Sequence, residues 1–334
     1  MRYLWGIALL GMLVASHGQA ASGYKKYFKE YQKPTKVPYP DDNKYSSARD
    51  QLGKTLFFDP RISGSGWISC ATCHNPALGW EDSLSLGFGH GMKKLGRHTP
   101  TILNLAWGEL FFWDGRASSL EEQALGPIEA AGEMNMNHDK MIAVLKSIKG
   151  YKPLFQKAYP KLGISKEAVG KAIATFERGV VSAKAPFDRW VAGNERAISE
   201  SAKRGFVVFN EKGKCANCHS GWRFTDDGFH DIGLKSKDKG RGGILKQIAA
   251  VQFAFKTPTL RNISQRGPYL HDGSEKTLMD VVEFYDRGGD TSRPSKSADV
   301  MKLGLTRKEK KDLVAFLNTL TSKDKAIEIP VLPQ

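Results

Sequence analysis

The sequence contains few cysteines, little of the alternation between apolar and polar residues that marks β-strands, and only one long apolar run. Four cysteines in 334 residues are too few for a scaffold held together by many disulfides. The weak alternation argues against a β-sandwich or barrel. After the N-terminus, no segment is long and apolar enough to cross a membrane. The chain is therefore expected to be mostly α-helical, with no membrane span in its mature part.

The exceptional apolar run lies at the N-terminus. Met1 and Arg2 precede an apolar stretch at 4–14, and small or polar residues follow as far as Ala20 and Ala21. A charged start, a short apolar middle and a small-residue cleavage site are typical of a secretory signal. The stretch is short for an uncleaved membrane anchor. We expect residues 1–20 to be a signal peptide and the mature protein to lie in the periplasm.

The charge of the chain is strongly positive. Lys and Arg number 50 and Asp and Glu number 35, which gives +15. Loss of Arg2 with the signal would leave 15 − 1 = +14. Nucleic acid is not an expected partner of an exported protein, whereas an acidic protein steered by charge is. The alternative is that the lysines only keep the chain soluble.

All four cysteines fall in two short motifs of the form Cys-x-x-Cys-His. The motifs are Cys70-Ala71-Thr72-Cys73-His74 and Cys215-Ala216-Asn217-Cys218-His219. Two thiols on one helical turn can add to the two vinyl groups of one haem, and the adjacent histidine can then ligate the iron. The motifs predict two covalently bound c-type haems, with His74 and His219 as iron ligands.

Three other interpretations of these cysteines compete with haem attachment. A structural zinc site would gather four Cys or His ligands without a histidine after each pair. A redox Cys-x-x-Cys lacks the adjacent histidine. Two disulfides could form in an oxidising compartment. Two complete motifs without a spare cysteine, in a chain that carries a signal peptide, favour haem.

The two motifs divide the chain into two similar parts. Their first cysteines are 215 − 70 = 145 residues apart, which suits one haem in each domain-sized unit. We expect two cytochrome c-like domains, an N-terminal one at 45–186 and a C-terminal one at 187–325. Apolar periodicity and capping residues predict helices at 165–181, at 199–209 and from Thr306 onward. Polar and Pro- or Gly-rich composition predicts a weakly structured arm at 22–44 and a solvated basic loop at 233–243.

Segments outside the cysteine motifs resemble the bacterial di-haem cytochrome c peroxidases and their MauG-type relatives. The resemblance spans about 45–322, in the order of the family. The matching segments include LGKTLFFDPRIS (52–63), GHG (89–91), TPTILNLAW (99–107), FWDGRASSLEEQALGP (112–127), TPTLRNI (257–263) and GPYLHDGSEKTL (267–278).

The resemblance implies that the first haem reacts with hydrogen peroxide and that the second exchanges electrons. Trp113 matches the tryptophan between the haems. Gln123 and Glu133 match polar residues over the peroxide-reactive haem, where a carboxylate can move a proton between the peroxide oxygens. Pro127 matches a residue that shapes the same pocket. These four residues are the expected catalytic group.

Two further features of the family are implied less directly. His90 matches a loop histidine that caps the first haem in resting peroxidases, whereas MauG-type proteins have this site open. The family also holds a calcium ion between the haems, partly by backbone carbonyls, and Arg266 and Pro268 match two of those positions. The family's asparagine ligand falls near His98, which is a departure from the pattern.

The far ligand of the second haem separates the branches of the family. Ordinary peroxidases place a methionine there, and alignment from the GPYLHDG and TL motifs puts Tyr285 at that position. A tyrosine at this point is the MauG-type pattern, and a hard phenolate favours ferric and higher oxidation states of iron. The alternative is that Tyr285 packs in the core while Met279 or Met301 ligates the iron.

The resemblance leads to three functional hypotheses. A MauG-type oxidase would use peroxide, or oxygen plus electrons, to complete the tryptophan tryptophylquinone of a methylamine dehydrogenase precursor. An ordinary peroxidase would detoxify peroxide with electrons from a small cytochrome. A non-catalytic electron carrier is the third. The surface tryptophan that MauG carries before its second motif is Gly213 here. Trp190 and Trp222 are nearby in the sequence, either as substitutes for it or as packing residues.

Overall fold

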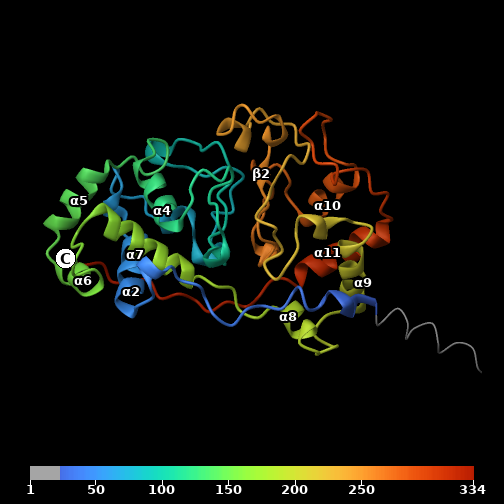
Figure 1. The fold of residues 1–334 in the computed structure, drawn as a ribbon, viewed down its shortest axis with the longest axis horizontal. Coiled ribbons are helices and arrows are strands. Elements are labelled where there is room, and N and C mark those ends of the chain that lie inside the picture. The colour runs from blue at the N-terminus through green and yellow to red at the C-terminus, as the bar shows by residue number, and fades with distance from the viewer. Residues whose placement is uncertain (1–22) are drawn as a thin grey trace, which may run out of the picture.

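The computed structural model describes residues 23–334 and consists of two helical halves that lie side by side (Figure 1). The predicted signal peptide lies outside these residues. Within them the only strands are β1 (Phe229–His230) and β2 (Phe255–Lys256), which pair antiparallel. No helix in this part of the chain has the length and apolar character that a membrane crossing needs.

Most of the ordered structure is helical. The N-terminal half contains α2 (Ser47–Phe57), α3 (Cys70–Cys73), α4 (Leu120–Glu129), α5 (His138–Ser147), α6 (Tyr151–Ala158) and α7 (Lys166–Gly179). The C-terminal half contains α8 (Pro186–Val191), α9 (Glu200–Asn210), α10 (Leu278–Asp286) and α11 (Arg307–Asn318). The prediction of a mostly α-helical chain is confirmed.

The three helices expected from the sequence are α7, α9 and α11, and each begins at a capping side chain. Ser165 and Ser199 accept a hydrogen bond from the backbone three residues further on. Thr306 forms the predicted capping box with Glu309. Capping satisfies backbone N–H groups that have no partner within the helix, and these three starts were therefore visible in the sequence.

Each half is built on one close helix crossing. In the N-terminal half, α2 crosses α7 where a Cβ on Gly53 would collide with the Ala172 carbonyl. In the C-terminal half, α9 crosses α11 where a Cβ on Gly205 would collide with the Asp312 carbonyl. A cysteine motif follows the first helix of each pair. The repeated arrangement defines two cytochrome c-like units, each with its own apolar core.

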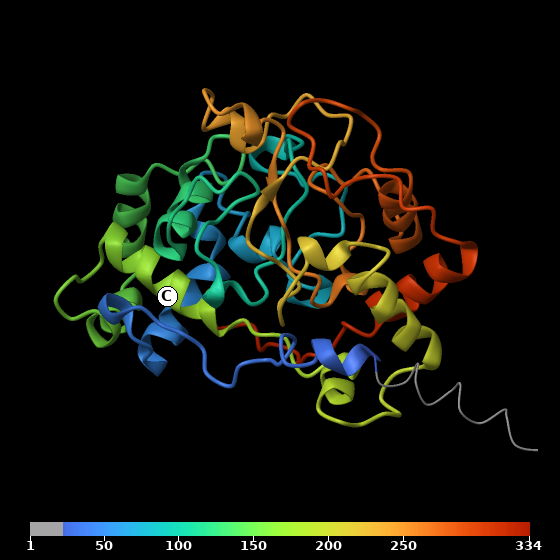
Figure 2. The same ribbon diagram turned by 45° about the vertical axis from the view of Figure 1, so that its right-hand side comes forward.

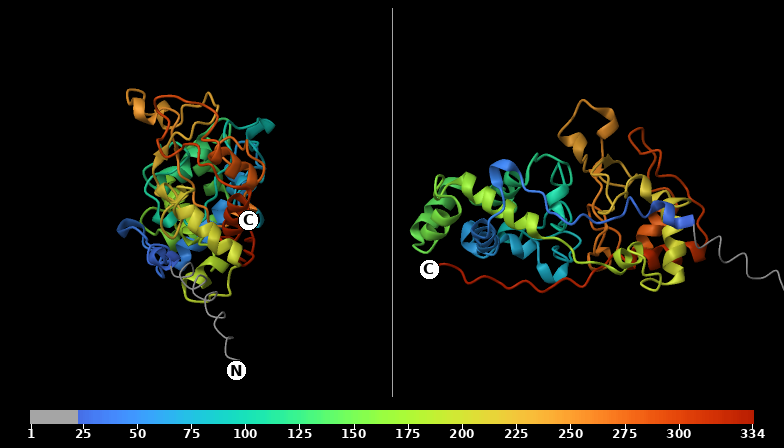
Figure 3. Two further views of the ribbon diagram at one scale, coloured as in Figure 1. Left: turned by 90° about the vertical axis from the view of Figure 1, so that its right-hand side faces the viewer. Right: turned by 60° about the horizontal axis from the view of Figure 1, so that its bottom comes forward.

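Both ends of the described chain connect the two halves. Near the N-terminus, Tyr24 and Tyr31 are buried in the core of the C-terminal half. At the other end of the chain, the backbone carbonyl of Gln334 accepts a 2.8 Å hydrogen bond from Gly150 in the N-terminal half. Figure 3 shows this tail, in red, running from the C-terminal half along the molecule to the N-terminal half. The predicted arm thus has only two short 3₁₀ turns, Gly23–Tyr27 and Asp41–Asn43, but is held in place.

The basic segment 233–243 is only partly the solvated loop that its composition predicted. Leu234 and Gly240 are buried. Asp238 accepts from Arg97 of the N-terminal half at 2.7 Å, and Arg241 donates to the backbone carbonyl of Asp114 at 2.8 Å. In Figure 2 this part of the chain, drawn in yellow to orange, lies at the junction of the two halves. Asp238 and Arg241 thus connect the segment to the N-terminal half, whereas its three lysines are exposed.

Candidate haem sites

The first motif opens onto a cavity of about 580 Å³ in the N-terminal half, which segments of the C-terminal half close. The residues of the first motif and the four expected catalytic residues all line it: Cys70, Cys73, His74, Trp113, Gln123, Pro127 and Glu133. They come from α3, from α4 and from the loops beside these helices. The fold therefore brings together residues that lie up to 63 positions apart, from Cys70 to Glu133.

His74 is arranged as a neutral metal ligand. It directly follows α3, where Ser69 and Thr72 form a capping box. Its Nδ1 lies 3.2 Å from the Trp80 carbonyl, an arrangement in which Nδ1 carries the proton and Nε2 keeps its lone pair. Burial lowers the pKa of His74, which keeps the ring neutral. A neutral imidazole beside two free thiols at the cavity wall fits a c-type haem.

Glu133 lies just beyond α4, in a segment that packs tightly on the GHG loop. The backbone N–H of His90 donates to the Glu133 carbonyl at 2.8 Å. A Cβ at Gly89 would collide with the Gly132 carbonyl, so only glycine allows this approach. Burial raises the pKa of the Glu133 carboxyl, although Arg116 opposes the change. The carboxyl can therefore hold or release a proton closer to neutral pH than an exposed glutamate can.

Trp113 is held by groups from both halves. Its indole Nε1 donates to the His98 carbonyl at 2.8 Å, and its own carbonyl accepts from the Lys256 N–H at 2.8 Å. The His271 ring lies edge-on at 6.4 Å. His98 belongs to the N-terminal half, whereas Lys256 and His271 belong to the C-terminal half. The indole is thus fixed at the junction of the two cytochrome units.

His90 is not among the residues that line the cavity. Its side chain faces a separate hollow lined by Gly64, Asn135, Met136 and Lys140. Its Nδ1 is buried without a hydrogen-bond partner among the described residues. The expected capping of the first haem by His90 therefore has no counterpart in this arrangement and stays a prediction.

The second motif repeats the geometry of the first. Cys215 begins a short 3₁₀ turn (Cys215–Asn217), and His219 follows with Nδ1 at 2.8 Å from the Phe224 carbonyl. Burial lowers the pKa of His219 as it does that of His74. The second site therefore also offers two thiols and one neutral imidazole with a free Nε2.

Tyr285 lies in α10, close to the second motif. Burial raises the pKa of its phenol, and the neighbouring Cys218 and Cys215 act in the same direction. Met301 is 47% exposed, and its sulfur accepts from the Lys214 ammonium at 3.3 Å. Met279 lies in the first turn of the same helix as Tyr285. Tyr285 is therefore a buried phenol close to both cysteines of the second motif, and its role as the far ligand stays a prediction.

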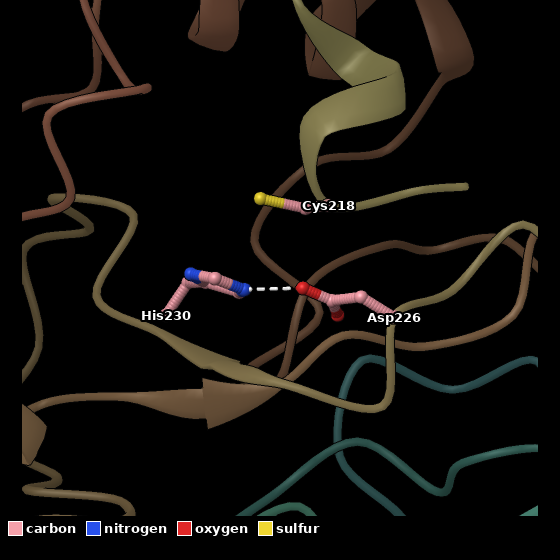
Figure 4. A group of neighbouring side chains, drawn as sticks. All are labelled: Cys218, Asp226 and His230. Atoms are coloured by element: carbon pink, nitrogen blue, oxygen red, sulfur yellow. Dashed lines mark hydrogen bonds and ion pairs between the residues drawn. The ribbon is translucent and has the colours of Figure 1, made fainter.

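A second group of polar side chains touches the second motif. The ligand atoms of Cys218, Asp226 and His230 lie within 4.8 Å of one another. The His230 Nε2 and an Asp226 oxygen are 2.7 Å apart (Figure 4), and this hydrogen bond, together with Cys218, raises the pKa of His230 to about 10. A thiol, a carboxylate and an imidazole could together bind zinc. Attachment of haem to Cys218 would remove the thiol and leave an ion pair beside the thioether.

Glu177 is a buried acid at the first cavity that the sequence analysis missed. It lies on α7 one turn after Ile173, and both residues line the cavity. Its side chain belongs to a residue only 4% exposed, and its Oε2 has no hydrogen-bond partner among the described residues. Burial raises its pKa to about 8. The signal in the sequence was an acid on the apolar face of a helix, four residues after Ile173.

Replacement of Glu177 by glutamine should change how stability depends on pH. The folded protein keeps the proton up to about pH 8, whereas an unfolded chain releases it near 4.5. The stability that this proton contributes is thus present in acid and is lost as the pH rises between these values. Glu177→Gln should shrink the difference in unfolding free energy between about pH 5 and about pH 8 by about 1–3 kcal/mol.

Thermal or denaturant unfolding across that pH range measures this change. Glu167→Gln is the matched control, because Glu167 is on the same helix with its side chain 57% exposed. If the pH dependence of Glu177→Gln ran parallel to that of the wild type and the control, the buried acid would not be protonated in the folded protein.

Two family models match the chain in order. The model described as "Di-haem cytochrome c peroxidase" matches residues 47–196, and the model described as "Cytochrome c" matches residues 202–321. The chain belongs to the family of di-haem cytochrome c peroxidases and MauG proteins. It is a haem-dependent, peroxidase-like oxidoreductase with two haem-binding cytochrome c units.

Within that family, the chain is similar to proteins named "Methylamine utilization protein MauG". It is 51% identical to the one from Methylorubrum extorquens over 91% of this chain and 86% of the relative, and 48% identical to the one from Methylophilus methylotrophus over 91% and 92%. A relative named "Cytochrome-c peroxidase IdrP1", from Pseudomonas sp. strain SCT, is 34% identical over 89% and 87%.

A solved structure shares the fold as well. The crystal structure of "a MauG-like protein associated with microbial copper homeostasis" matches with a TM-score of 0.80 and 30% identity, over 88% of this chain and 95% of that one.

Proposed function

We propose that the protein is a periplasmic MauG-like oxidase that acts on protein side chains. It uses hydrogen peroxide, or oxygen plus electrons, to complete tryptophan tryptophylquinone in a precursor of methylamine dehydrogenase. The observation that carries the proposal is Tyr285, which lies beside Cys215 and Cys218 where ordinary peroxidases have a methionine. The names of the two relatives near 50% identity support the same substrate.

The haems, covalently bound through the four cysteines, would supply the redox chemistry. His74 and His219, each held by a carbonyl at Nδ1, would hold the iron through a neutral Nε2. Gln123 can donate a hydrogen bond to peroxide in the first cavity. Glu133, whose pKa is raised by burial, can take a proton from one peroxide oxygen and return it to the other. Pro127 shapes the wall beside them.

Tyr285 distinguishes this chain from a detoxifying peroxidase. A phenolate is a hard, anionic ligand that stabilises ferric and higher oxidation states, whereas a thioether favours ferrous iron. A second site with a phenolate accepts electrons poorly from a small cytochrome. It suits the storage of an oxidising equivalent until a slow protein substrate is bound. Trp113, fixed at the junction of the two halves, would carry electrons between the two sites, as the family resemblance implies.

Oxidation of a protein too large to enter the cavity needs a path to the surface. Gly213 leaves no room for the tryptophan of other family members, because a Cβ there would lie 2.7 Å from the Val208 carbonyl. Trp190 is fully buried. Trp222 instead lies three residues after His219, is partly exposed, and contacts Trp107 edge-to-face at 4.7 Å. We assign the exit path to Trp222 and Trp107.

The net charge of +15 favours an acidic protein partner in this role. The second candidate function is peroxide detoxification with electrons from a small cytochrome. The specific observation that favours it is the 34% identity to a relative named as a cytochrome-c peroxidase. A carrier without catalysis would have no use for Gln123 and Glu133 in the cavity.

One experiment separates these functions. The purified protein with both haems is given peroxide and either a methylamine dehydrogenase precursor or a reduced small cytochrome. We expect the quinone absorbance of the precursor to appear at each addition of peroxide, with slow oxidation of the cytochrome. Rapid oxidation of the cytochrome without any change in the precursor would establish the peroxidase instead.

A further inference from the structure

A closed cluster of three ionisable side chains lies at the junction of the two halves, beside Trp113. Glu81 and His98 come from the N-terminal half and Arg266 comes from the C-terminal half. All three residues are between 2% and 4% exposed. The family resemblance implies a calcium ion in this region, held by the carbonyls of Arg266 and Pro268 and by an amide oxygen at the position of His98.

The side chains present do not fit that ion. Calcium binds six to eight oxygen ligands. His98 offers nitrogens instead, and both are engaged: Nδ1 is 2.8 Å from the Leu84 carbonyl and Nε2 is 3.1 Å from an oxygen of Glu81. The imidazole cannot replace the amide oxygen as a ligand.

The single carboxylate of the cluster is also fully engaged. One oxygen of Glu81 accepts from Nη1 of Arg266 at 2.8 Å, and the other faces His98. Arg266 also donates to two backbone carbonyls, from Nε to the Arg261 carbonyl at 3.0 Å and from Nη2 to the Thr259 carbonyl. A fixed guanidinium charge at this point repels a divalent cation.

We propose that the Glu81–His98–Arg266 cluster replaces the calcium ion of the family in this protein. The Arg266 guanidinium supplies the positive charge at the junction, and Glu81 connects it to the opposite half. Gly79 allows this packing, because a Cβ there would lie 2.8 Å from Cγ of Arg266.

The cluster also positions Trp113. The His98 carbonyl accepts from the indole at 2.8 Å, and the His98 N–H donates to the His271 carbonyl at 2.7 Å. Glu81 holds the His98 ring in place. Because the carbonyl that accepts from the Trp113 indole belongs to the same His98, holding the ring also holds this carbonyl. The three side chains are therefore positioning residues for Trp113. This role does not depend on which substrate is oxidised.

Metal analysis of the purified protein with both haems tests the replacement. We expect no stoichiometric calcium, and no change in melting temperature or ferric absorption spectrum on treatment with EGTA or on addition of calcium. One calcium ion per chain in the wild type, removed by EGTA with a change in the spectrum, would overturn the proposal.

A variant designed to bind calcium tests the same proposal in the opposite direction. The double variant His98→Asn/Arg266→Thr restores an amide oxygen and removes the guanidinium, and it leaves Glu81 unpaired. It should bind one calcium ion, measured by calorimetry or terbium luminescence, and its melting temperature should rise with calcium. Arg287→Thr, which breaks an exposed ion pair with Asp290, is the control and should bind none. A folded double variant that binds no calcium would count against the replacement, and the wild-type metal content decides if the variant does not fold.

Discussion

Replacement of Tyr285 by phenylalanine is expected to slow the oxidation of a protein substrate by about 100-fold or more. Loss of groups that only support a metal ligand costs 10- to 100-fold in activity, so loss of the ligand itself should reach at least the upper figure. The phenol is buried close to Cys215 and Cys218. The ferric absorption spectrum, the midpoint potential of the second haem and the yield of oxidised precursor measure the effect.

The variant Tyr285→Met should shift the activity from oxidation of the protein substrate toward that of an ordinary peroxidase. A thioether should raise the midpoint potential and speed electron transfer from a small reduced cytochrome, while oxidation of the precursor falls. Tyr159→Phe is the matched control, because its buried hydroxyl bonds Asn43 at 3.0 Å on the far side of the N-terminal half. Unchanged spectra of both haems in Tyr285→Phe would show that the phenol is not a ligand.

Replacement of Glu133 by glutamine is the second change with a large expected effect. Proton transfer by a positioned side chain contributes about 10²- to 10⁴-fold to a rate, and Glu133→Gln should slow the reaction with peroxide by that factor. Burial raises the pKa of this carboxyl, so the wild-type rate should fall as the solution is made acidic and the carboxylate is protonated. The variant should lack this acid limb.

Stopped-flow measurements across a range of pH test both parts of this prediction. Glu129→Gln is the control, since Glu129 ends α4 four residues before Glu133 and its side chain is 58% exposed. A rate for Glu133→Gln close to that of the wild type and of the control, with the acid limb intact, would assign the proton transfer to another group. Glu177, another buried acid that lines the cavity and has a raised pKa, would then be the candidate.

The parts of the protein that depend on local chemistry were predictable from the sequence. The two Cys-x-x-Cys-His motifs predict haem attachment because the two cysteines and the histidine of each motif lie within about one helical turn. The starts of α7, α9 and α11 were visible because capping needs only side chains a few residues apart. The family motifs predicted which residues would line the cavity, and the structure brings Trp113, Gln123, Pro127 and Glu133 to it.

The parts that depend on contacts between the halves were not predictable. Asp238 belonged to a segment expected to be solvated, and its partner Arg97 is 141 residues away in the chain. Glu81 was missed because nothing near it in sequence marks its pairing with Arg266, 185 residues further on. Glu177 was missed because it is flanked by ordinary helix residues and becomes unusual only where α7 meets the cavity. The direction of the His90 ring depends on the packing of its loop against the Glu133 segment.

The two terminal segments of the described chain each contact the cytochrome unit that lies farther away in the sequence. Tyr31, near the beginning of the described chain, belongs to the core of the second cytochrome unit, and Gln334, at its end, bonds to the first. Each unit thus makes contacts with residues from the opposite end of the described chain, in addition to the contacts at the junction beside Trp113. A change at either terminal segment is therefore expected to affect the packing of the unit that lies farther away in the sequence.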